Sequence, residues 1–71
     1  MKRKYKNNMA EYRKAIGKTQ QQLALDTGTS DTTIQNIEYG NRIPNLCLAK
    51  SIANALKKTV DEIFPEYENT T

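Results

Sequence analysis

The apolar residues recur at helical spacing in five short segments, each preceded by a residue that can cap a helix. Met9, Tyr12 and Ile16 are three and four residues apart, which places them on one helical face. Glycine or proline follows most of the segments. The pattern predicts helices over residues 9–16, 20–27, 31–38 and 46–57, and one more helical turn over 60–64. Because no strand-type alternation of useful length interrupts them, the predicted fold class is all-α.

Polar residues of the right type mark where these helices begin and end. Three pairs have the spacing of a capping box: Asn8 with Glu11, Thr19 with Gln22, and Thr59 with Glu62. Gly28 should take a left-handed backbone conformation, in which a β-carbon would cost about 1–2 kcal/mol. Ser30 can cap a new helix only two residues later. Two helices joined by a turn of about three residues are therefore expected over 20–38.

The apolar positions also predict which face of each helix is buried. The expected inward residues are Met9, Tyr12, Ile16, Leu23, Ala24, Thr27, Ile34, Ile37, Leu46, Ala49, Ile52, Ala53, Leu56, Val60, Ile63 and Phe64. In the third helix, Ile34 and Ile37 form the inward pair. Thr32, Thr33, Gln35 and Asn36 are then left as its polar outer surface.

Size and composition exclude several classes of protein. With 71 residues the chain has room for one small domain. The single cysteine, Cys47, cannot form an internal disulfide, and the absence of histidine removes the usual zinc ligand sets. No apolar run approaches the roughly 20 residues of a membrane-spanning helix, and the basic start lacks the apolar segment of a secretory signal. We expect a cytoplasmic protein without a metal, cofactor or small-molecule ligand.

The net charge of +3 is unevenly distributed. Residues 1–30 carry seven basic and two acidic side chains, whereas residues 31–71 carry four basic and six acidic ones. This polarity favours a polyanion as the partner of the basic end. We divide the chain into a basic arm (1–7), a domain (8–65) and an acidic tail (66–71). Phosphate contacts without sequence preference are expected from the basic side chains of the arm, with a solvated tail as the alternative: Lys2, Arg3, Lys4 and Lys6.

Taken together, the motifs resemble the Cro and lambda-type phage repressor family, also called the XRE family. The resemblance covers about residues 9–64. It rests on Arg13, Thr19, Gln20, Leu23, Ala24, Gly28, Ser30, Ile34, Ile37, Glu38, Gly40, Pro44, Ile52, Ala53, Leu56 and the closing sequence DEIF. It implies a compact five-helix bundle that contains a helix-turn-helix, the lambda-repressor-like DNA-binding domain.

The resemblance further implies which residues contact DNA. Bases in the major groove would be read from the third helix by Asp31, Thr32, Thr33, Gln35 and Asn36. For Thr33 and Gln35 individually, a phosphate contact or no contact stays open as the alternative. The DNA backbone would be contacted by Asn41 and Arg42 in the loop after the third helix and by Gln20 at the start of the second. Gln20 would also support the third helix, with a solvated side chain as the alternative. Because Gln and Asn can pair with adenine through two hydrogen bonds, sites containing A·T steps are favoured.

Four charged positions either depart from the family pattern or match a structural feature of it. Asp31 fits the DNA-contacting set least well, since phosphates repel a carboxylate; helix capping and acceptance from cytosine N4 both stay open. Arg13 and Glu38 match a pair that forms an internal salt bridge in many relatives, and we interpret them as structural, with an exposed pair as the alternative. Lys18 stands where relatives bury an apolar residue, so Ile16 is expected to fill that space.

The predicted function is sequence-specific DNA binding for transcription regulation, with repression the favoured direction. A weak homodimer would recognise two half-sites of a palindromic operator about 34–36 Å apart on double-stranded DNA. The alternative is a protein-interaction or antitoxin-type module with the same fold. An enzyme has the least support, because the sequence has no histidine, no glycine-rich phosphate loop and no nucleophile beside a base. When bound to DNA, the protein would be associated with the nucleoid.

Overall fold

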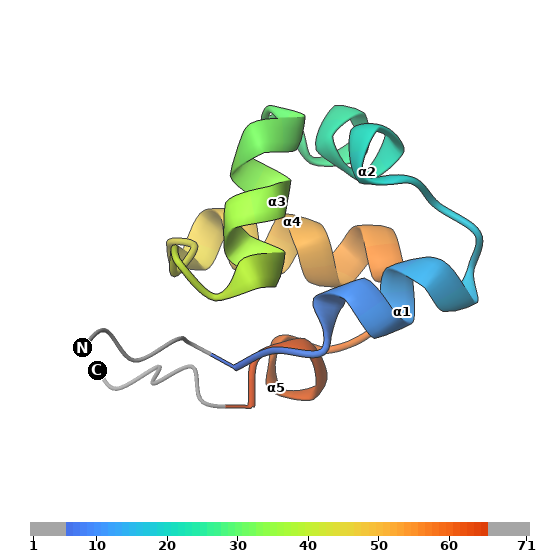
Figure 1. The fold of residues 1–71 in the computed structure, drawn as a ribbon. Helices are drawn as coiled ribbons and strands as arrows, with labels where there is room; N and C mark the ends of the chain where they lie inside the picture. The colour runs from blue at the N-terminus through green and yellow to red at the C-terminus, as the bar shows by residue number, and fades with distance from the viewer. Residues whose placement is uncertain (1–5, 66–71) are drawn as a thin grey trace.

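Five α-helices follow one another along residues 6–65, the part of the chain that the computed structural model describes (Figure 1). Their bounds are α1 Met9–Ala15, α2 Gln20–Thr27, α3 Asp31–Tyr39, α4 Leu46–Leu56 and α5 Val60–Ile63. Within 6–65 no residue is in a β-strand. The all-α fold class is confirmed, and each helix begins and ends within one residue of its predicted bounds.

The helices form two groups around the core. The consecutive pair α2 and α3 packs together, and α2 also packs on α4, which runs behind α3 in the view of Figure 1. At the other end of the domain, α5 packs on α4 and meets the start of α1, where the Asn8 backbone N–H donates to the Ile63 carbonyl at 2.7 Å. This arrangement leaves one long side of α3 on the surface.

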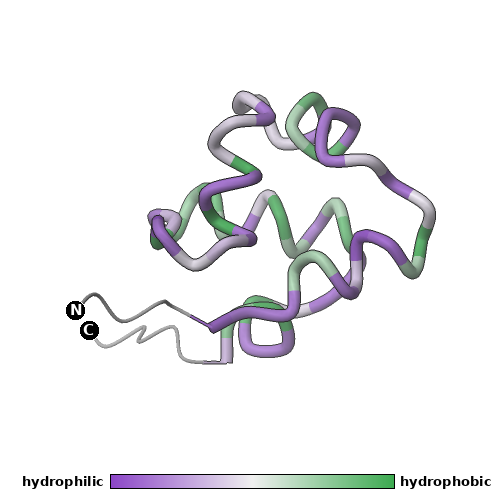
Figure 2. Tube along the Cα trace, viewed as in Figure 1, coloured by the Kyte–Doolittle hydropathy of each residue, from purple (hydrophilic) through white to green (hydrophobic). Residues whose placement is uncertain are grey.

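The core is the apolar set that the helical spacing predicts, with two exceptions. Buried apolar side chains come from all five helices, and in α4 hydrophobic positions alternate with polar ones along the helix (Figure 2). The buried set is Met9, Leu23, Ala24, Ile34, Ile37, Ala49, Ile52, Ala53, Leu56, Ile63 and Phe64. Ile16 is 47% exposed and Leu46 is 38% exposed, so the prediction was wrong for both.

The physical reason for the exposed Ile16 is that α1 ends one residue earlier than expected. Ile16 is the C-cap of α1, and Gly17 follows with φ of +74°, which turns the chain toward α2. Ile16 therefore lies outside the helical repeat that would carry it inward. Lys18 is half-buried, and its ammonium forms an ion pair with Asp26.

Side-chain caps begin four of the five helices: Thr19, Ser30 and Thr59 as predicted, and Asn45 before α4. The capping boxes at Thr19 and Thr59 are complete. The cap predicted at Asn8 is absent. Instead, the preceding residue supplies the acceptor: Asn7 Oδ1 accepts the Met9 backbone N–H at 3.0 Å, and the Asn8 side chain donates to the Glu62 carbonyl at 2.9 Å.

The turn between α2 and α3 depends on Gly28. Its φ of +73° is the left-handed conformation predicted from the sequence, and its backbone N–H donates to the Leu25 carbonyl. Ser30 then caps α3 by accepting the Thr33 N–H. The turn thus ends one helix and starts the next within three residues. Over the described part of the chain, none of the helices is both long and apolar enough to span a membrane.

Candidate nucleic-acid interface

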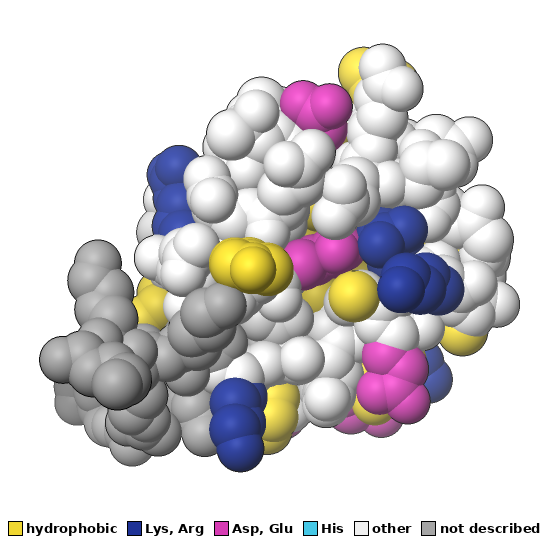
Figure 3. All heavy atoms as spheres, viewed as in Figure 1, with side chains coloured by type: hydrophobic (Ala, Val, Ile, Leu, Met, Phe, Trp, Pro, Cys, Tyr) yellow, Lys and Arg dark blue, Asp and Glu magenta, His cyan; other side chains and the backbone are white. Residues whose placement is uncertain are grey.

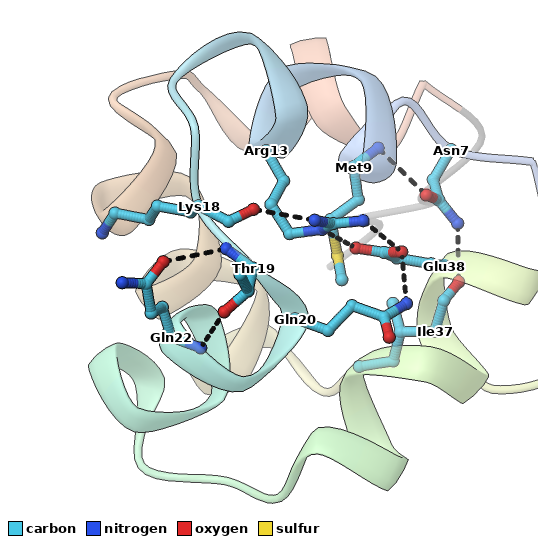
Figure 4. Close-up of polar contacts among 9 residues, drawn as sticks. All are labelled: Asn7, Met9, Arg13, Lys18, Thr19, Gln20, Gln22, Ile37 and Glu38. Atoms are coloured by element: carbon cyan, nitrogen blue, oxygen red, sulfur yellow. Dashed lines mark hydrogen bonds and ion pairs between the residues drawn. The ribbon is translucent and has the colours of Figure 1, made fainter.

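A buried ion pair ties the C-terminal part of α3 to α1 (Figure 4). Arg13 Nε donates to Glu38 Oε2 at 2.6 Å, and Arg13 Nη2 donates to Glu38 Oε1 at 3.3 Å. Arg13 Nη1 donates to the Lys18 carbonyl at 2.7 Å, which also holds the loop before α2. The two side chains are 10% and 8% exposed, so the pair is internal. An isolated buried charge is costly, and here the guanidinium reaches both a carboxylate and a carbonyl.

Gln20 joins the same cluster from the first turn of α2. Its Nε2 donates to Glu38 Oε1 at 2.9 Å, so the carboxylate accepts from α1 and from α2 at once (Figure 4). The side chain is half-buried rather than solvated. The sequence placed Gln20 against α3 and at a phosphate; its contact with Glu38 places it against α3. The contact also fixes the distance between the start of α2 and the end of α3.

The five residues predicted to read bases lie along α3 and its first turn. Asp31, Thr32 and Gln35 are exposed, while Thr33 and Asn36 are half-buried. Thr33 Oγ1 lies 3.0 Å from Ser30 Oγ, so its hydroxyl already has a partner within the cap. Among the described residues, the side chains of Thr32, Gln35 and Asn36 make no hydrogen bond. Their donors and acceptors are therefore available to a ligand.

A concave surface of about 640 Å³ runs along one side of α3. It joins residues from α1, α2, α3 and the loop that follows α3: Ala10, Gln20, Gln35, Asn36, Glu38, Tyr39 and Asn41. Four of these were predicted DNA contacts, namely Gln20, Gln35, Asn36 and Asn41. The fold therefore brings predicted base-reading and backbone-contacting residues to one surface.

Tyr39 belongs to this surface and was missed by the sequence analysis. It is the last residue of α3, is 65% exposed, and lines the concavity together with Asn36 and Asn41. Helical spacing gave a usable signal, because Tyr39 follows Asn36 by three residues and Gln35 by four. Because the predicted helix ended at residue 38, this spacing was not applied to Tyr39.

Charge is distributed around the concave surface rather than within it. Of its lining residues only Glu38 is charged, while Arg42 in the loop after α3 is exposed. In Figure 3 the α3 side is mostly uncharged, with acidic atoms near its centre and at its upper end and basic atoms toward its edges. Lys6 is exposed, and the other predicted arm contacts, Lys2, Arg3 and Lys4, lie outside the described residues.

Other site chemistry is limited. No group of three or more potential metal ligands occurs within residues 6–65, and Cys47 is exposed. In the last helix, the Thr59 backbone N–H donates to the Glu62 carboxylate and holds the pKa of Glu62 below its ordinary value. This group belongs to a capping box on α5 and has no part in the concave surface.

Comparison with known proteins identifies the family. The family model described as helix-turn-helix matches residues 9–63. The chain belongs to the Cro/lambda-type (XRE) helix-turn-helix family of DNA-binding transcriptional regulators. In this family member, α2 and α3 are the helix-turn-helix, and the outer side of α3 with its concave surface is the candidate DNA interface.

Two curated relatives illustrate the similarity. The transcriptional repressor RstR of cryptic phage CTXphi from Vibrio cholerae is 40% identical over 60 residues, which are 84% of this chain and 54% of RstR. The present chain thus spans about half the length of RstR. An uncharacterised helix-turn-helix transcriptional regulator from Methanothermobacter thermautotrophicus is 42% identical over 55 residues, which are 76% of this chain and 80% of that protein.

Solved structures agree with the fold of this XRE-family chain. The restriction-modification controller protein C.AhdI from Aeromonas hydrophila aligns with a TM-score of 0.75 at 30% identity, covering 80% of this chain and 86% of that one. The N-terminal DNA-binding domain of SinR from Bacillus subtilis aligns with a TM-score of 0.74 at 19% identity, covering 89% and 91%. At that lower identity the second likeness concerns the fold alone.

Proposed function

We propose that this protein is a transcriptional repressor that places α3 in the major groove of a palindromic operator and binds as a dimer. One observation carries the proposal: the concave surface along α3 combines the side chains of Gln35, Asn36 and Tyr39 with Gln20 and Asn41 from its two flanks. A major groove about 12 Å wide admits one helix, and side chains on that helix then reach the base edges.

In this proposal some residues contact base edges and thereby read the sequence, and the others contact the DNA backbone. Gln35 and Asn36 each carry an amide that can donate to and accept from adenine. The methyl group of Thr32 can pack against the methyl group of thymine. Thr33 is the weaker reader because its hydroxyl is bonded to Ser30. Gln20, Tyr39, Asn41 and Arg42 flank the readers, where contacts to phosphates fix the orientation of α3 without carrying sequence information.

Asp31 is best explained as a helix residue that does not contact DNA. It lies in the first turn of α3 and is exposed. A negative charge there is favourable for the helix dipole, whereas proximity to phosphates would repel it. Asp31→Asn should therefore leave sequence preference unchanged and raise affinity for every duplex. A change of preference at a single C·G position would instead assign Asp31 to cytosine N4.

Repression and dimeric binding are supported by the relatives and by geometry. RstR, whose matched region is 40% identical, is named a transcriptional repressor. One α3 offers few base contacts, so two half-sites about one helical turn apart would supply the discrimination that a single one lacks. We propose weak association in solution that is completed on DNA. Sedimentation with and without operator tests this, and a stable monomer on a single half-site would contradict it.

Selection of bound duplexes from a random-sequence pool tests the function directly. The expected result is an enriched motif with two-fold symmetry. Its affinity should fall with salt at a slope of log K against log salt near −5 to −9, as about 6–10 phosphate contacts imply. A pool without enrichment would contradict sequence-specific binding. An enriched motif without symmetry would contradict the dimer.

A second candidate function is a protein-interaction module of the same fold, and one observation favours it. Leu25 and Ile16 are 76% and 47% exposed and line a separate depression together with Gln22. Exposed apolar side chains that lie together on a surface can form a contact for another protein. A flat salt response of DNA affinity, together with loss of partner binding in Leu25→Ser, would favour this candidate over the repressor.

A further inference from the structure

Large apolar side chains at the surface are concentrated in one short segment. Among the described residues, five large apolar side chains are exposed, and three of them lie within residues 39–46. Tyr39 ends α3, Ile43 lies in the following loop at 57% exposed, and Leu46 begins α4. A single exposed leucine is common, whereas apolar side chains grouped on a surface mark contacts. We call Tyr39, Ile43 and Leu46 the loop patch.

The loop patch continues the candidate DNA interface. Tyr39 also lines the concave surface, and Arg42, a proposed phosphate contact, is exposed in the loop between Tyr39 and Ile43. Figure 1 shows this loop at the left, where α3 ends and α4 begins. The other exposed apolar pair, Ile16 and Leu25, lines a depression that shares no residue with the concave surface. The loop patch is therefore the apolar surface that lies beside the proposed DNA contacts.

The charge within this segment opposes self-association. Arg42 is the one charged side chain among residues 39–47. The acidic residue before it, Glu38, is already paired with Arg13, and the next acidic residue along the chain is Asp61. If two copies met loop patch to loop patch across a two-fold axis, each Arg42 would approach its own counterpart. The segment supplies no carboxylate to balance the two charges, so they would repel each other.

The dimensions of the domain fit a small contact of this kind. Half-sites one helical turn apart hold the centres of two copies about 34–36 Å from one another. The domain measures 30 × 26 × 21 Å over its Cα atoms, so two such copies meet only at their edges once side chains are added. Three large side chains per copy are far fewer than the about 20–30 residues per side of a stable interface. The contact is therefore weak in isolation.

We propose that the loop patch is the surface through which two copies of this chain associate, and that Arg42 makes this association depend on DNA; this rests on the proposed function. In the free protein, the two Arg42 side chains repel each other across the axis. On an operator, phosphates next to the loop neutralise both of them and leave the apolar contact. Because DNA then binds the pair more tightly than two separate copies, DNA binding and association strengthen each other.

Sedimentation of the full chain without DNA, at several salt concentrations, tests the surface. The double variant Ile43→Gln with Leu46→Gln removes the aliphatic part of the loop patch and should weaken self-association at least about tenfold. Leu25→Gln is the matched control, because Leu25 is exposed but lies outside the patch. It should leave the dissociation constant of the dimer unchanged. Circular dichroism verifies that each variant is folded.

Arg42→Gln tests the dependence on DNA. Without DNA it should strengthen self-association about 2- to 5-fold at low salt, and the difference should vanish at high salt, where screening removes the repulsion. On the selected duplex, fluorescence anisotropy should show weaker binding and a salt slope that is shallower by up to about 1.8, because each of two copies loses one phosphate contact. Lys14→Gln is the control: it removes the same charge from the last turn of α1, which ends away from the loop in Figure 1, and should leave self-association unchanged.

The single cysteine gives an independent measurement. Cys47 is exposed and directly follows Leu46. Two loop patches that face each other bring the two copies of this thiol close together, so a short bismaleimide should link them. Operator DNA should raise the yield of linked dimer. The double variant at Ile43 and Leu46 should lower that yield with and without DNA. If the natural chain sediments as a monomer without DNA, the yield on operator DNA is the measure that compares the variants.

Three outcomes would overturn the proposal. Loss of association in Leu25→Gln but not in the double variant would place the contact at the other depression. Equal effects of Arg42→Gln and Lys14→Gln would show that net charge, and not position, governs association. Absence of linkage through Cys47 on operator DNA would show that the loop patches do not face each other; this result needs no variant to fold. Failure of the natural chain to bind any duplex specifically contradicts the proposed function instead, and the measurements without DNA still decide where two copies meet.

Discussion

The inner and outer sides of α3 differ in how their polar groups are used. At the edge of the inner side, where Glu38 and Gln20 also line the concave surface, Glu38 accepts hydrogen bonds from Arg13 and Gln20, and all three side chains are buried or half-buried. On the outer side, Gln35 and Asn36 make no side-chain hydrogen bond to any described residue. Polar groups that the fold needs are paired, because an unpaired buried group is costly. Polar groups that the fold leaves unpaired at the surface can serve a ligand.

This difference explains how α3 is anchored in the core while polar side chains on its outer side stay available to a ligand. Ile34 and Ile37 are fully buried, and Glu38 follows at once with its ion pair. Helical geometry puts Gln35 and Asn36 between these anchors but on the other side. Substitutions on the two sides should therefore separate stability from DNA affinity, and the following predictions test that separation.

The largest effect is expected from Glu38→Ala. It leaves the Arg13 guanidinium buried without its counter-charge and should lower the free energy of unfolding by about 3–5 kcal/mol. Urea unfolding followed by circular dichroism measures this. Gln35→Ala, three residues away on the outer side, is the control and should change that free energy by less than about 0.5 kcal/mol. Similar losses from both would remove the distinction between the two sides.

The next effect concerns binding and not stability. Asn36→Ala should lower affinity for the selected duplex by about 1–3 kcal/mol and relax preference at one or two base positions. Selection from a random pool with the variant reports both. Lys4→Ala is the comparison and should weaken all sequences alike. If Asn36→Ala instead lowers affinity equally for every sequence, Asn36 contacts the backbone.

A smaller effect is expected from Gly28→Ala in the turn that sets α3 against α2. A β-carbon at Gly28 meets no atom within 4 Å, so the cost comes only from its φ of +73°. We expect a loss of about 1–2 kcal/mol in the free energy of unfolding. Asparagine tolerates this conformation, so Gly28→Asn should lose less free energy of unfolding than Gly28→Ala. Thermal melts of the natural chain and of both variants measure this. Equal losses would point to a cause other than backbone conformation.

The smallest effect lies on α5, away from both sides of α3. The backbone N–H of Thr59 holds the pKa of Glu62 below its ordinary value of 4.5, so the ionised carboxylate stabilises the fold. That stabilisation is present above pH 4.5 and is lost as the pH falls through the lowered pKa. The difference in melting temperature between the natural chain and Glu62→Gln should therefore shrink on acidification. A difference that is constant with pH would contradict this, and DNA affinity at neutral pH should not change.

Much of the fold was predictable because its signals are local. A cap such as Thr19 or Ser30 acts on a backbone N–H three residues away, so sequence spacing alone reveals it. The cap at Asn8 was predicted wrongly because Asn7 and Asn8 bind carbonyls that are 30 and 54 residues away along the chain. Ile16 was wrongly placed in the core for a related reason, since the helix that would have carried it inward ends at Ala15.

The candidate interface was predictable in part. Resemblance to the XRE family indicated Gln20, Gln35, Asn36 and Asn41, and the fold brings these four to one concave surface. It did not indicate Tyr39, because the predicted end of the third helix fell one residue short. Nor did it reveal that the hydroxyl of Thr33 is occupied by Ser30 or that Gln20 is bonded to Glu38.

The helices, most of their caps, the apolar core and the family could be predicted from the amino-acid sequence. These follow from the spacing of side chains along one chain, which a local rule can evaluate. The folded structure was needed to show that Arg13 and Glu38 are buried, that Gln20 joins them, and that Asn7 binds α3. Each of these contacts joins residues that are 18 to 30 positions apart, and such partners meet only after the core has packed and fixed the helices against one another.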